Sequence, residues 1–155
     1  LPEAQLDRFM FNIVLDYPSL EEELQVVKST TNDAPASVQK VIGKEEIIAF
    51  QHLVRRIPIA DNVVEYAVKL VASTRPNTAS AAKVVDEFVA WGAGPRASQA
   101  LVIAAKGHAA IHGKFSPDIE DVKAVALPIL RHRIIRNFKA EAEGMSMEKI
   151  IAQLL

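Results

Sequence analysis

Residues 94–113 read GPRASQALVIAAKGHAAIHG, and this stretch decides the fold class. Pro95 suits the first position of a helix, because it lacks the amide hydrogen that would have no partner there. His112 and Gly113 are expected to end this helix. One face carries Ala97, Leu101, Ala104, His108 and Ile111. A long helix with such a face predicts packing against other helices.

Helical patterns recur on both sides of this stretch. The predicted ranges are 3–8, 19–29, 44–57, 61–75, 116–130 and 146–155. Ser19, Asp61 and Ser116 are the expected N-caps of three of these helices. Pro128 should kink or end its helix, and residues 76–93 are expected to be irregular. Four or five helices with short connections over residues 40–155 predict a mainly α fold, a small helical bundle.

A different pattern occupies residues 9–15. Apolar side chains alternate so that both faces of a strand would be largely apolar, which is typical of an α/β sheet covered on both sides. The chain offers no other good strand, so we expect the neighbouring strands to precede Leu1. The chain is therefore expected to be an excised fragment, in which a short helix–strand stub and a polar linker at 30–39 precede the bundle.

Composition excludes several classes of function. The 155 residues include 18 Lys+Arg and 19 Asp+Glu, a formal charge of −1, which weighs against broad attraction to nucleic acid or anionic lipid. Cysteine is absent, so disulfides, thiol catalysis and zinc–thiolate sites are excluded. No apolar run approaches the roughly 20 residues of a membrane span, and no signal peptide is visible. We therefore expect no membrane span and an intracellular location.

Two histidines and several missing motifs bear on catalysis. His108 and His112 lie four residues apart on one predicted helix, a spacing that can hold a metal. No further ligand is predicted on that face, so we interpret both as structural and predict no metal site. The chain has no GxxxxGK[ST] loop, no paired acids for magnesium and no recognisable Ser-His-Asp set. By itself it holds no complete catalytic apparatus.

Arg96 is the most informative candidate residue. A cation in the first turn of a helix opposes the helix dipole, at a cost of about 0.3–1 kcal/mol. The unpaired N–H groups at a helix start attract anions, and a guanidinium beside them makes a phosphate clamp. The alternative is an exposed arginine, or one paired with Asp86 or Glu87. The residues alone leave both interpretations open.

Other basic residues carry weaker signals. Arg8 follows Asp7 at the expected rim of a sheet, where ligands bind, although a local surface pair of the two is the simpler interpretation. A basic cluster is formed by Arg131, His132, Arg133, Arg136 and Lys139. The cluster could meet nucleic acid or an acidic partner, or it could be a solvated helix end.

Several separated segments resemble the MoxR family of AAA+ ATPases. Residues 1–9 (LPEAQLDRF) and 16–19 (DYPS) are similar to the end of its ATPase core. Residues 91–98 (WGAGPRAS) resemble its sensor 2 segment, and residues 116–126 and 130–134 resemble the end of its helical lid. The resemblance covers essentially the whole chain.

This resemblance implies a division of the chain. Residues 1–18 would be the end of an α/β AAA+ core, 19–39 a connecting helix and linker, and 40–155 the helical lid domain. The nucleotide-binding loop and the magnesium-binding acids would precede Leu1. The resemblance therefore implies ATP and Mg²⁺ in the full-length protein, whereas this fragment alone should be inactive and bind neither.

The resemblance also implies roles for particular residues. Arg8 would be the arginine finger that reaches the γ-phosphate of ATP on a neighbouring subunit, which can contribute about 10³–10⁵ in rate. Arg96 would be the sensor 2 arginine, contacting the nucleotide phosphates together with Gly94 and Pro95. These assignments come from the matching motifs.

The family further implies a chaperone-like, cytoplasmic ATPase that remodels or matures protein complexes. By family analogy it would form a homo-oligomeric, hexameric ring and work with a partner bearing a von Willebrand factor A domain, with no nucleic-acid partner. Two alternatives remain. One is a non-enzymatic helical protein-interaction module that uses a face of the bundle. The other is a nucleic-acid binder that uses Arg131, Arg133, Arg136 and Lys139.

Overall fold

The computed structural model describes residues 3–33 and 38–155. Within them it forms nine helices and two short strands. The elements are α1 (Glu3–Leu6), α2 (Leu20–Thr30), α3 (Lys44–Arg56), α4 (Asp61–Ser73), α5 (Lys83–Phe88), β1 (Val89–Trp91), α6 (Pro95–Ile111), α7 (Ile119–Leu130), β2 (Ile135–Arg136), α8 (Phe138–Ala142) and α9 (Met147–Ala152). Leu1, Pro2 and the part of the predicted linker at 34–37 lie outside the described residues.

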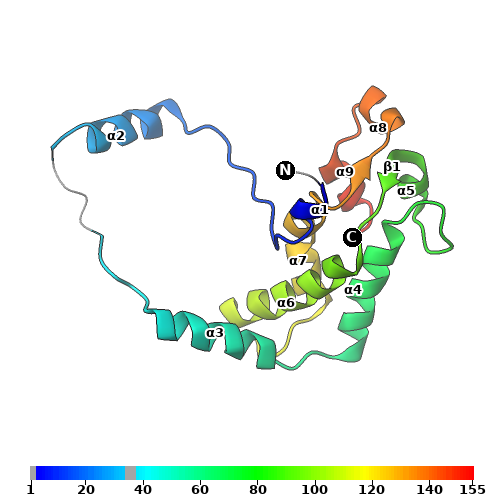
Figure 1. Cartoon of the computed structure of the whole chain (residues 1–155), viewed down its shortest axis with the longest axis horizontal. Helices are drawn as coiled ribbons and strands as arrows, with labels where there is room; N and C mark the ends of the chain where they lie inside the picture. Colours follow the sequence, from blue (N-terminus) through cyan, green and yellow to red (C-terminus); the bar gives the residue numbers. More distant parts are fainter. Residues whose placement is uncertain (1–2, 34–37) are drawn as a thin grey trace.

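Helix α6 is the centre of the bundle. It packs against α7, α4 and α3, while α9 packs against α7 (Figure 1). Strands β1 and β2 pair antiparallel beside α5. The largest fully buried apolar side chains are Val71, Val85, Leu101, Val122, Ile129, Leu130, Ile150 and Ile151. The predicted mainly α bundle is confirmed.

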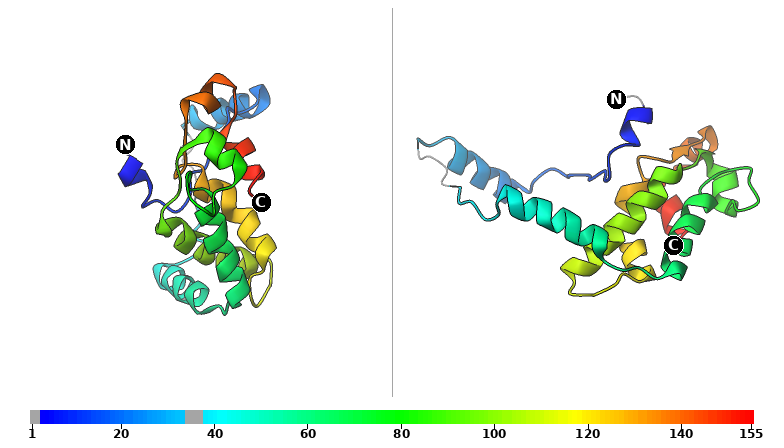
Figure 2. Two further views of the ribbon diagram at one scale, coloured as in Figure 1. Left: turned by 90° about the vertical axis from the view of Figure 1, so that its right-hand side faces the viewer. Right: turned by 60° about the horizontal axis from the view of Figure 1, so that its bottom comes forward.

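Helix α2 stands apart from the bundle and has no buried residue (Figure 1; right-hand view of Figure 2). Its N-cap is the predicted Ser19, whose backbone N–H donates to Glu22 Oε2 at 2.8 Å. The Ser19 hydroxyl accepts from the Glu22 N–H at 3.3 Å. This capping box explains why the helix begins where the sequence predicted, although its residues are all exposed.

The strand predicted at residues 9–15 is wrong. These residues are extended but form no strand. A hydrogen bond between backbone groups joins them to the bundle, from Asn12 N–H to Pro128 O at 2.8 Å, and the Phe9 and Met10 oxygens contact side chains that follow α7. Alternating apolar residues favour a strand only where a neighbouring strand supplies a ladder of hydrogen bonds, and the described residues place none beside them. The helix–strand stub is therefore a short helix followed by an extended segment.

The irregular region predicted at residues 76–93 is also wrong in part. It contains α5 and β1, and β1 pairs with β2, although no second strand was expected. A six-residue helix is too short to show a periodic pattern. The strands meet through a pairing distant in sequence, which local patterns do not reveal.

Two predicted caps lie at other residues. Asp118, and not Ser116, is the N-cap of α7, because its carboxylate accepts from the Asp121 N–H at 3.1 Å. Asp61 is the first residue of α4 and makes no side-chain cap. Pro128 lies in the last turn of α7, which continues to Leu130. The predicted end of α6 is confirmed: Gly113 has a φ of +72°, and Lys114 N–H donates to Ala109 O at 2.8 Å.

No helix in residues 3–33 and 38–155 has the length and apolar character needed to cross a membrane.

Asp121 is a fully buried carboxylate between α6 and α7. It accepts hydrogen bonds from Lys114 Nζ at 3.0 Å and from its own capping partner, Asp118 N–H, at 2.9 Å. His108 Nδ1 lies 2.7 Å from Asp121 Oδ1. Burial raises the pKa of Asp121, but the hydrogen bonds from Asp118, His108 and Lys114 outweigh burial and lower it to about 2. The carboxylate therefore remains charged in the folded chain.

Replacing Asp121 should make the free energy of unfolding less dependent on pH in the acid range. A carboxylate whose pKa is lowered on folding contributes stability above its unfolded value of 3.8 and loses it as the pH falls towards 2. That contribution is about 2 kcal/mol. We expect Asp121→Asn to lower the free energy of unfolding at pH 7 and to flatten its fall between pH 4 and 2. Urea denaturation across this range measures both, with Asp61→Asn as control; an unchanged pH profile would contradict the assignment.

Candidate functional site

The site is built around the segment that leads into α6. Gly94 is the N-cap, Pro95 the first helical residue and Arg96 the second, as the sequence predicted. No side chain caps the first turn, and the first turn holds no acidic residue. Pro95 has no N–H, and the Ala97 N–H donates to Gly94 O at 3.0 Å, so the positive end of the helix dipole and the Arg96 N–H are what this start offers beside the guanidinium.

The end of α4 holds this segment in place. Thr74 Oγ1 accepts from the Ala93 N–H at 3.0 Å and donates to Val71 O at 2.7 Å. Arg75 Nε donates to Ala93 O at 3.0 Å. Because both backbone groups of Ala93 are bonded to Thr74 and Arg75, the two residues that follow α4, the start of α6 has a fixed position.

Gly92 allows the two segments to approach closely. A Cβ at Gly92 would lie 2.3 Å from Thr74 O and 2.7 Å from Arg75 Cα. Backbone atoms cannot move aside as a flexible side chain can, so only glycine fits here. A Cβ at Gly94 would meet nothing within 4 Å, which leaves that position open to solvent.

Arg96 is exposed at the surface of the site. Its side chain is 58% exposed, and its Nη1 lies 3.6 Å from Asp7 Oδ2. The alternative pairing with Asp86 or Glu87 is wrong, because Asp86 accepts from Asn77 N–H and Glu87 pairs with Lys139. The guanidinium is therefore held only by a long, partly exposed ion pair.

Arg8 is also exposed, and it makes no hydrogen bond or ion pair within residues 3–33 and 38–155. The local pair predicted between Asp7 and Arg8 is wrong, since Asp7 pairs with Arg96 and Arg133. Asp7, which directly precedes Arg8 in the sequence, thus contacts Arg96. The structure places both predicted arginines at one corner of the molecule with their side chains available.

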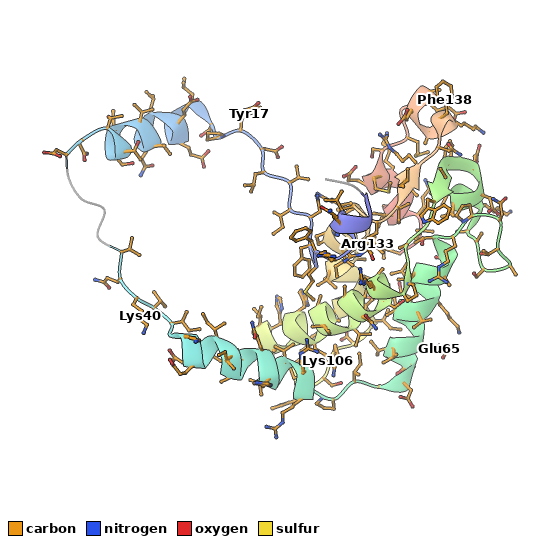
Figure 3. All side chains as sticks on the ribbon, viewed as in Figure 1. Tyr17, Lys40, Glu65, Lys106, Arg133 and Phe138 are labelled. Atoms are coloured by element: carbon orange, nitrogen blue, oxygen red, sulfur yellow. The ribbon has the colours of Figure 1, made fainter. Side chains whose placement is uncertain are left out.

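Arg133 anchors this corner. Its side chain is only 2% exposed, and all five of its N–H donors have acceptors. Figure 3 shows it next to α1. Nε donates to Asp7 Oδ1 at 3.1 Å, and the other donors reach backbone oxygens of Asp7 (2.9 Å), Phe9 (2.6 Å), Met10 (3.2 Å) and Ile129. The interpretation of Arg133 as part of a solvated helix end is wrong.

Three of the remaining members of the basic cluster are also engaged, whereas the Nε of Arg131 is buried without a hydrogen-bond partner among the described residues. His132 Nε2 lies 3.0 Å from Phe9 O and therefore donates to it, and burial lowers the pKa of His132. Arg136 Nη1 donates to Met145 O at 2.9 Å. Lys139 pairs with Glu87 and lies 5.3 Å from the centre of the Phe88 ring. These contacts weigh against a shared surface for nucleic acid.

The two histidines on α6 have structural roles. His108 contacts Asp121, and His112 Nδ1 lies 2.8 Å from His108 O. The sequence predicted no acidic residue on the helix face that carries the two histidines. The acidic neighbour of His108, Asp121, comes instead from α7. In the described part of the chain, no group of three or more His, Cys, Asp or Glu side chains is placed to hold a metal ion. The site offers cations to an anionic ligand.

Two hollows flank residues 91–95. One has a volume of about 410 Å³ and is lined by Arg75, Trp91 and Pro95 among others. The other, of about 340 Å³, includes Asp7, Trp91 and Arg133 in its lining. The corner therefore combines concave surface, an uncapped helix start and exposed guanidinium groups, an arrangement that suits a phosphate-bearing ligand.

Sequence reasoning missed Thr74, Arg75, Gly92 and Asp7 as parts of this site. Gly92 stood inside a quoted motif, but its steric role depends on a partner 18 residues earlier. Arg133 was noticed only as one of several cations. One signal could have distinguished Arg133 from the other cations of the cluster. It follows a helix predicted to be buried, and a buried charge needs hydrogen-bond partners.

Comparison with known families identifies the helical part. Residues 81–154 match the family model described as the AAA lid domain. Residues 81–154 are an AAA lid domain. The match includes β1, α6, α7 and the residues up to α9, so the start of α6 with Gly94, Pro95 and Arg96 lies inside the lid domain.

The similarity extends beyond the lid domain. The chain is 34% identical over its whole length to the uncharacterized protein YeaC of Bacillus subtilis and 32% identical to Chaperone MoxR1 of Mycobacterium tuberculosis. A crystal structure of a presumed ATPase from Cytophaga hutchinsonii matches 99% of the chain with a TM-score of 0.88 and 35% identity. The chain spans 46%, 41% and 47% of these three proteins, respectively. The chain is therefore related to Chaperone MoxR1 and to the other two proteins, and it spans about half the length of each.

The contact between Gly92 and α4 yields a test of the lid domain. We expect Gly92→Ala to lower the free energy of unfolding by about 1–3 kcal/mol, because the added Cβ overlaps backbone atoms. Gly94→Ala is the matched control, and its effect should stay below about 1 kcal/mol since that position is open. Chemical denaturation measures both. Equal effects would show that the close approach does not constrain the segment.

The Arg133 anchor yields a second test. Arg133→Ala should release Asp7–Met10 from the lid domain, because four of the five bonds of the guanidinium go to these residues. We expect exchange of the Asn12 amide hydrogen, which is bonded to Pro128 O, to accelerate at least about tenfold. Arg136→Ala is the control, since Arg136 bonds only Met145 O. Unchanged exchange in Arg133→Ala would be the contrary result.

Proposed function

We propose that this chain is the lid and sensor 2 region of a MoxR-type AAA+ ATPase, in which Arg96 and Arg8 contact the phosphates of ATP. One observation carries the proposal. Asp7 pairs with Arg96 at 3.6 Å, so the Arg8 motif and the sensor 2 motif, 88 positions apart, meet at one corner with both guanidinium groups exposed. The family match over residues 81–154 and the relation to Chaperone MoxR1 support it.

The charge at this corner suits a polyphosphate. The single carboxylate of Asp7 lies between the guanidinium groups of Arg96 and Arg133, and Arg8 adds a further cation. The chain as a whole has a net charge of −1, so this corner is positive against its surroundings. An anion here gains from the cations and from the start of α6.

Each arginine would have a distinct role in phosphoryl transfer. ATP with its bound Mg²⁺ supplies the transferable phosphoryl group, and this chain supplies fixed positive charge. Arg96, on the first turn of α6, would bind and orient the phosphates together with Gly94 and Pro95. Arg8, which has no partner within the described residues, would stabilise the negative charge that develops on the γ-phosphate of a neighbouring subunit.

The proposal includes further parts that follow from the family. Residues 1–18 would belong to the ATPase core, 19–39 to a connecting helix and linker, and 40–155 to the lid. A finger supplied by a neighbour makes hydrolysis depend on assembly, which favours a ring, hexameric by family analogy. The full-length protein would remodel or mature other protein complexes in the cytoplasm, with a von Willebrand factor A domain protein as partner.

Substitutions in the full-length protein test the two roles. Arg8→Ala should lower ATP turnover by about 10³-fold or more with little change in ATP affinity, because a finger acts in the transition state. Arg96→Ala should weaken ATP binding as well as turnover, because it contacts the bound phosphates. Steady-state hydrolysis and calorimetric binding measure these effects.

The control for both is Arg56→Ala, which removes an exposed arginine at the end of α3. It should leave turnover unchanged. Near-normal turnover in both Arg8→Ala and Arg96→Ala would refute the proposal.

A second candidate function has one specific observation in its favour. An apolar groove of about 780 Å³ lies between α3, α6 and the segment at Met10 and Phe11. Helix α3 has no buried residue, and Ile47 and Phe50 line the groove while about half exposed. A groove of this kind would suit a helical protein-interaction module. Loss of partner binding in Phe50→Asp, in a full-length protein that hydrolyses no ATP, would favour that function over the first.

A further inference from the structure

Trp91 is exposed for a reason built into its strand. In a regular strand, Val89 and Trp91 would point to the same face. Here Val89 is 4% exposed and Trp91 is 71% exposed. An irregularity in the pairing separates them, since Val89 lies opposite Arg136 and Trp91 opposite Ile135. A bulge of this kind redirects a side chain, and bulges often lie beside functional sites.

The backbone that carries Trp91 is fixed. Gly92, the next residue, packs directly against Thr74 and Arg75, and Ala93 is bonded to both. The indole is thus displayed from a rigid segment. Such a side chain binds a flat partner with little loss of conformational entropy, because its backbone is already ordered.

Both hollows of the site border Trp91. The hollow of about 410 Å³ also contains Arg75, Gly94 and Pro95, and the hollow of about 340 Å³ also contains Asp7. Gly92 and Gly94 line both hollows and contribute no side chain. A planar group can therefore approach the indole beside the backbone of residues 92–94.

The two features of this corner suit the two ends of one ligand. Guanidinium groups and a helix start favour an anion, while an exposed indole beside concave surface favours a planar aromatic ring. A nucleotide has both parts. Resting on the proposed function, we infer that Trp91 stacks on the base of the nucleotide whose phosphates Arg96 contacts.

The inference predicts how binding divides between base and phosphate. Stacking of a base on an aromatic side chain is lost when the ring is removed, and every base has a face that can stack. Removing the indole should weaken ligands that have a base and leave a bare polyphosphate unaffected. Phenylalanine should restore much of the affinity, because it keeps an aromatic face.

The test measures calorimetric affinity of the full-length protein for ATP and for inorganic tripolyphosphate, each with Mg²⁺. Trp91→Ala should weaken ATP binding by about 5- to 100-fold and leave tripolyphosphate binding unchanged. Trp91→Phe should fall within a few-fold of the original affinity for ATP. Phe115→Ala, which removes a 94% exposed aromatic ring just beyond the far end of α6, should change neither affinity.

Several results would overturn the inference. Equal ATP affinity in the original protein and Trp91→Ala would exclude stacking, and an equal loss for ATP and tripolyphosphate would assign Trp91 a structural role. A change in subunit assembly with an unaltered ratio of the two affinities would show that protein covers the indole. If the original protein bound neither ligand, the proposed function itself would fail, which separates that failure from the failure of stacking.

Discussion

The buried guanidinium of Arg133 is the constraint on which this site depends. A charge removed from water is tolerated only when its hydrogen bonds are made and a counter-charge is near. Arg133 meets both requirements with the carboxylate of Asp7 and four backbone oxygens. Three of those oxygens belong to residues 7, 9 and 10. The hydrogen bonds that make the burial of Arg133 tolerable therefore also hold the N-terminal segment beside α7.

The lid domain combines a rigid part and an open part. Contacts from Thr74, Arg75 and Gly92 hold the start of α6, from which the exposed Arg96 side chain projects, and Arg8 is exposed on the neighbouring N-terminal segment. This division is what a phosphate-contacting surface requires, because cations act best when their backbones are ordered and their donors remain unused. Helix α2, by contrast, owes its form to its cap and not to packing.

Sequence reasoning predicted the elements whose signals are local. The helix at 95–111 was correct because Pro95 and Gly113 mark its ends, and the capping box of Ser19 and Glu22 was correct for the same reason. Phe9–Leu15 was wrong because alternation cannot supply a neighbouring strand. The site shows the same contrast between local and long-range signals. Local motifs located Arg8 and Arg96, whereas the contacts of Asp7, Thr74 and Arg133 join segments that are distant in sequence and could not be predicted. The roles of Arg8 and Arg96 stay predictions.

The shared carboxylate of Asp7 has a thermodynamic consequence. Its Oδ1 accepts from Arg133 Nε at 3.1 Å and its Oδ2 lies 3.6 Å from Arg96 Nη1, so one negative charge is shared between two cations. A ligand that draws Arg96 away leaves Asp7 wholly to Arg133 and tightens the hold on the segment that carries Arg8. By reciprocity, an event that stretches that segment must change the affinity of Arg96 for its ligand by the same factor. Ligand binding at Arg96 and the position of the segment that carries Arg8 would thereby be coupled through the one carboxylate of Asp7.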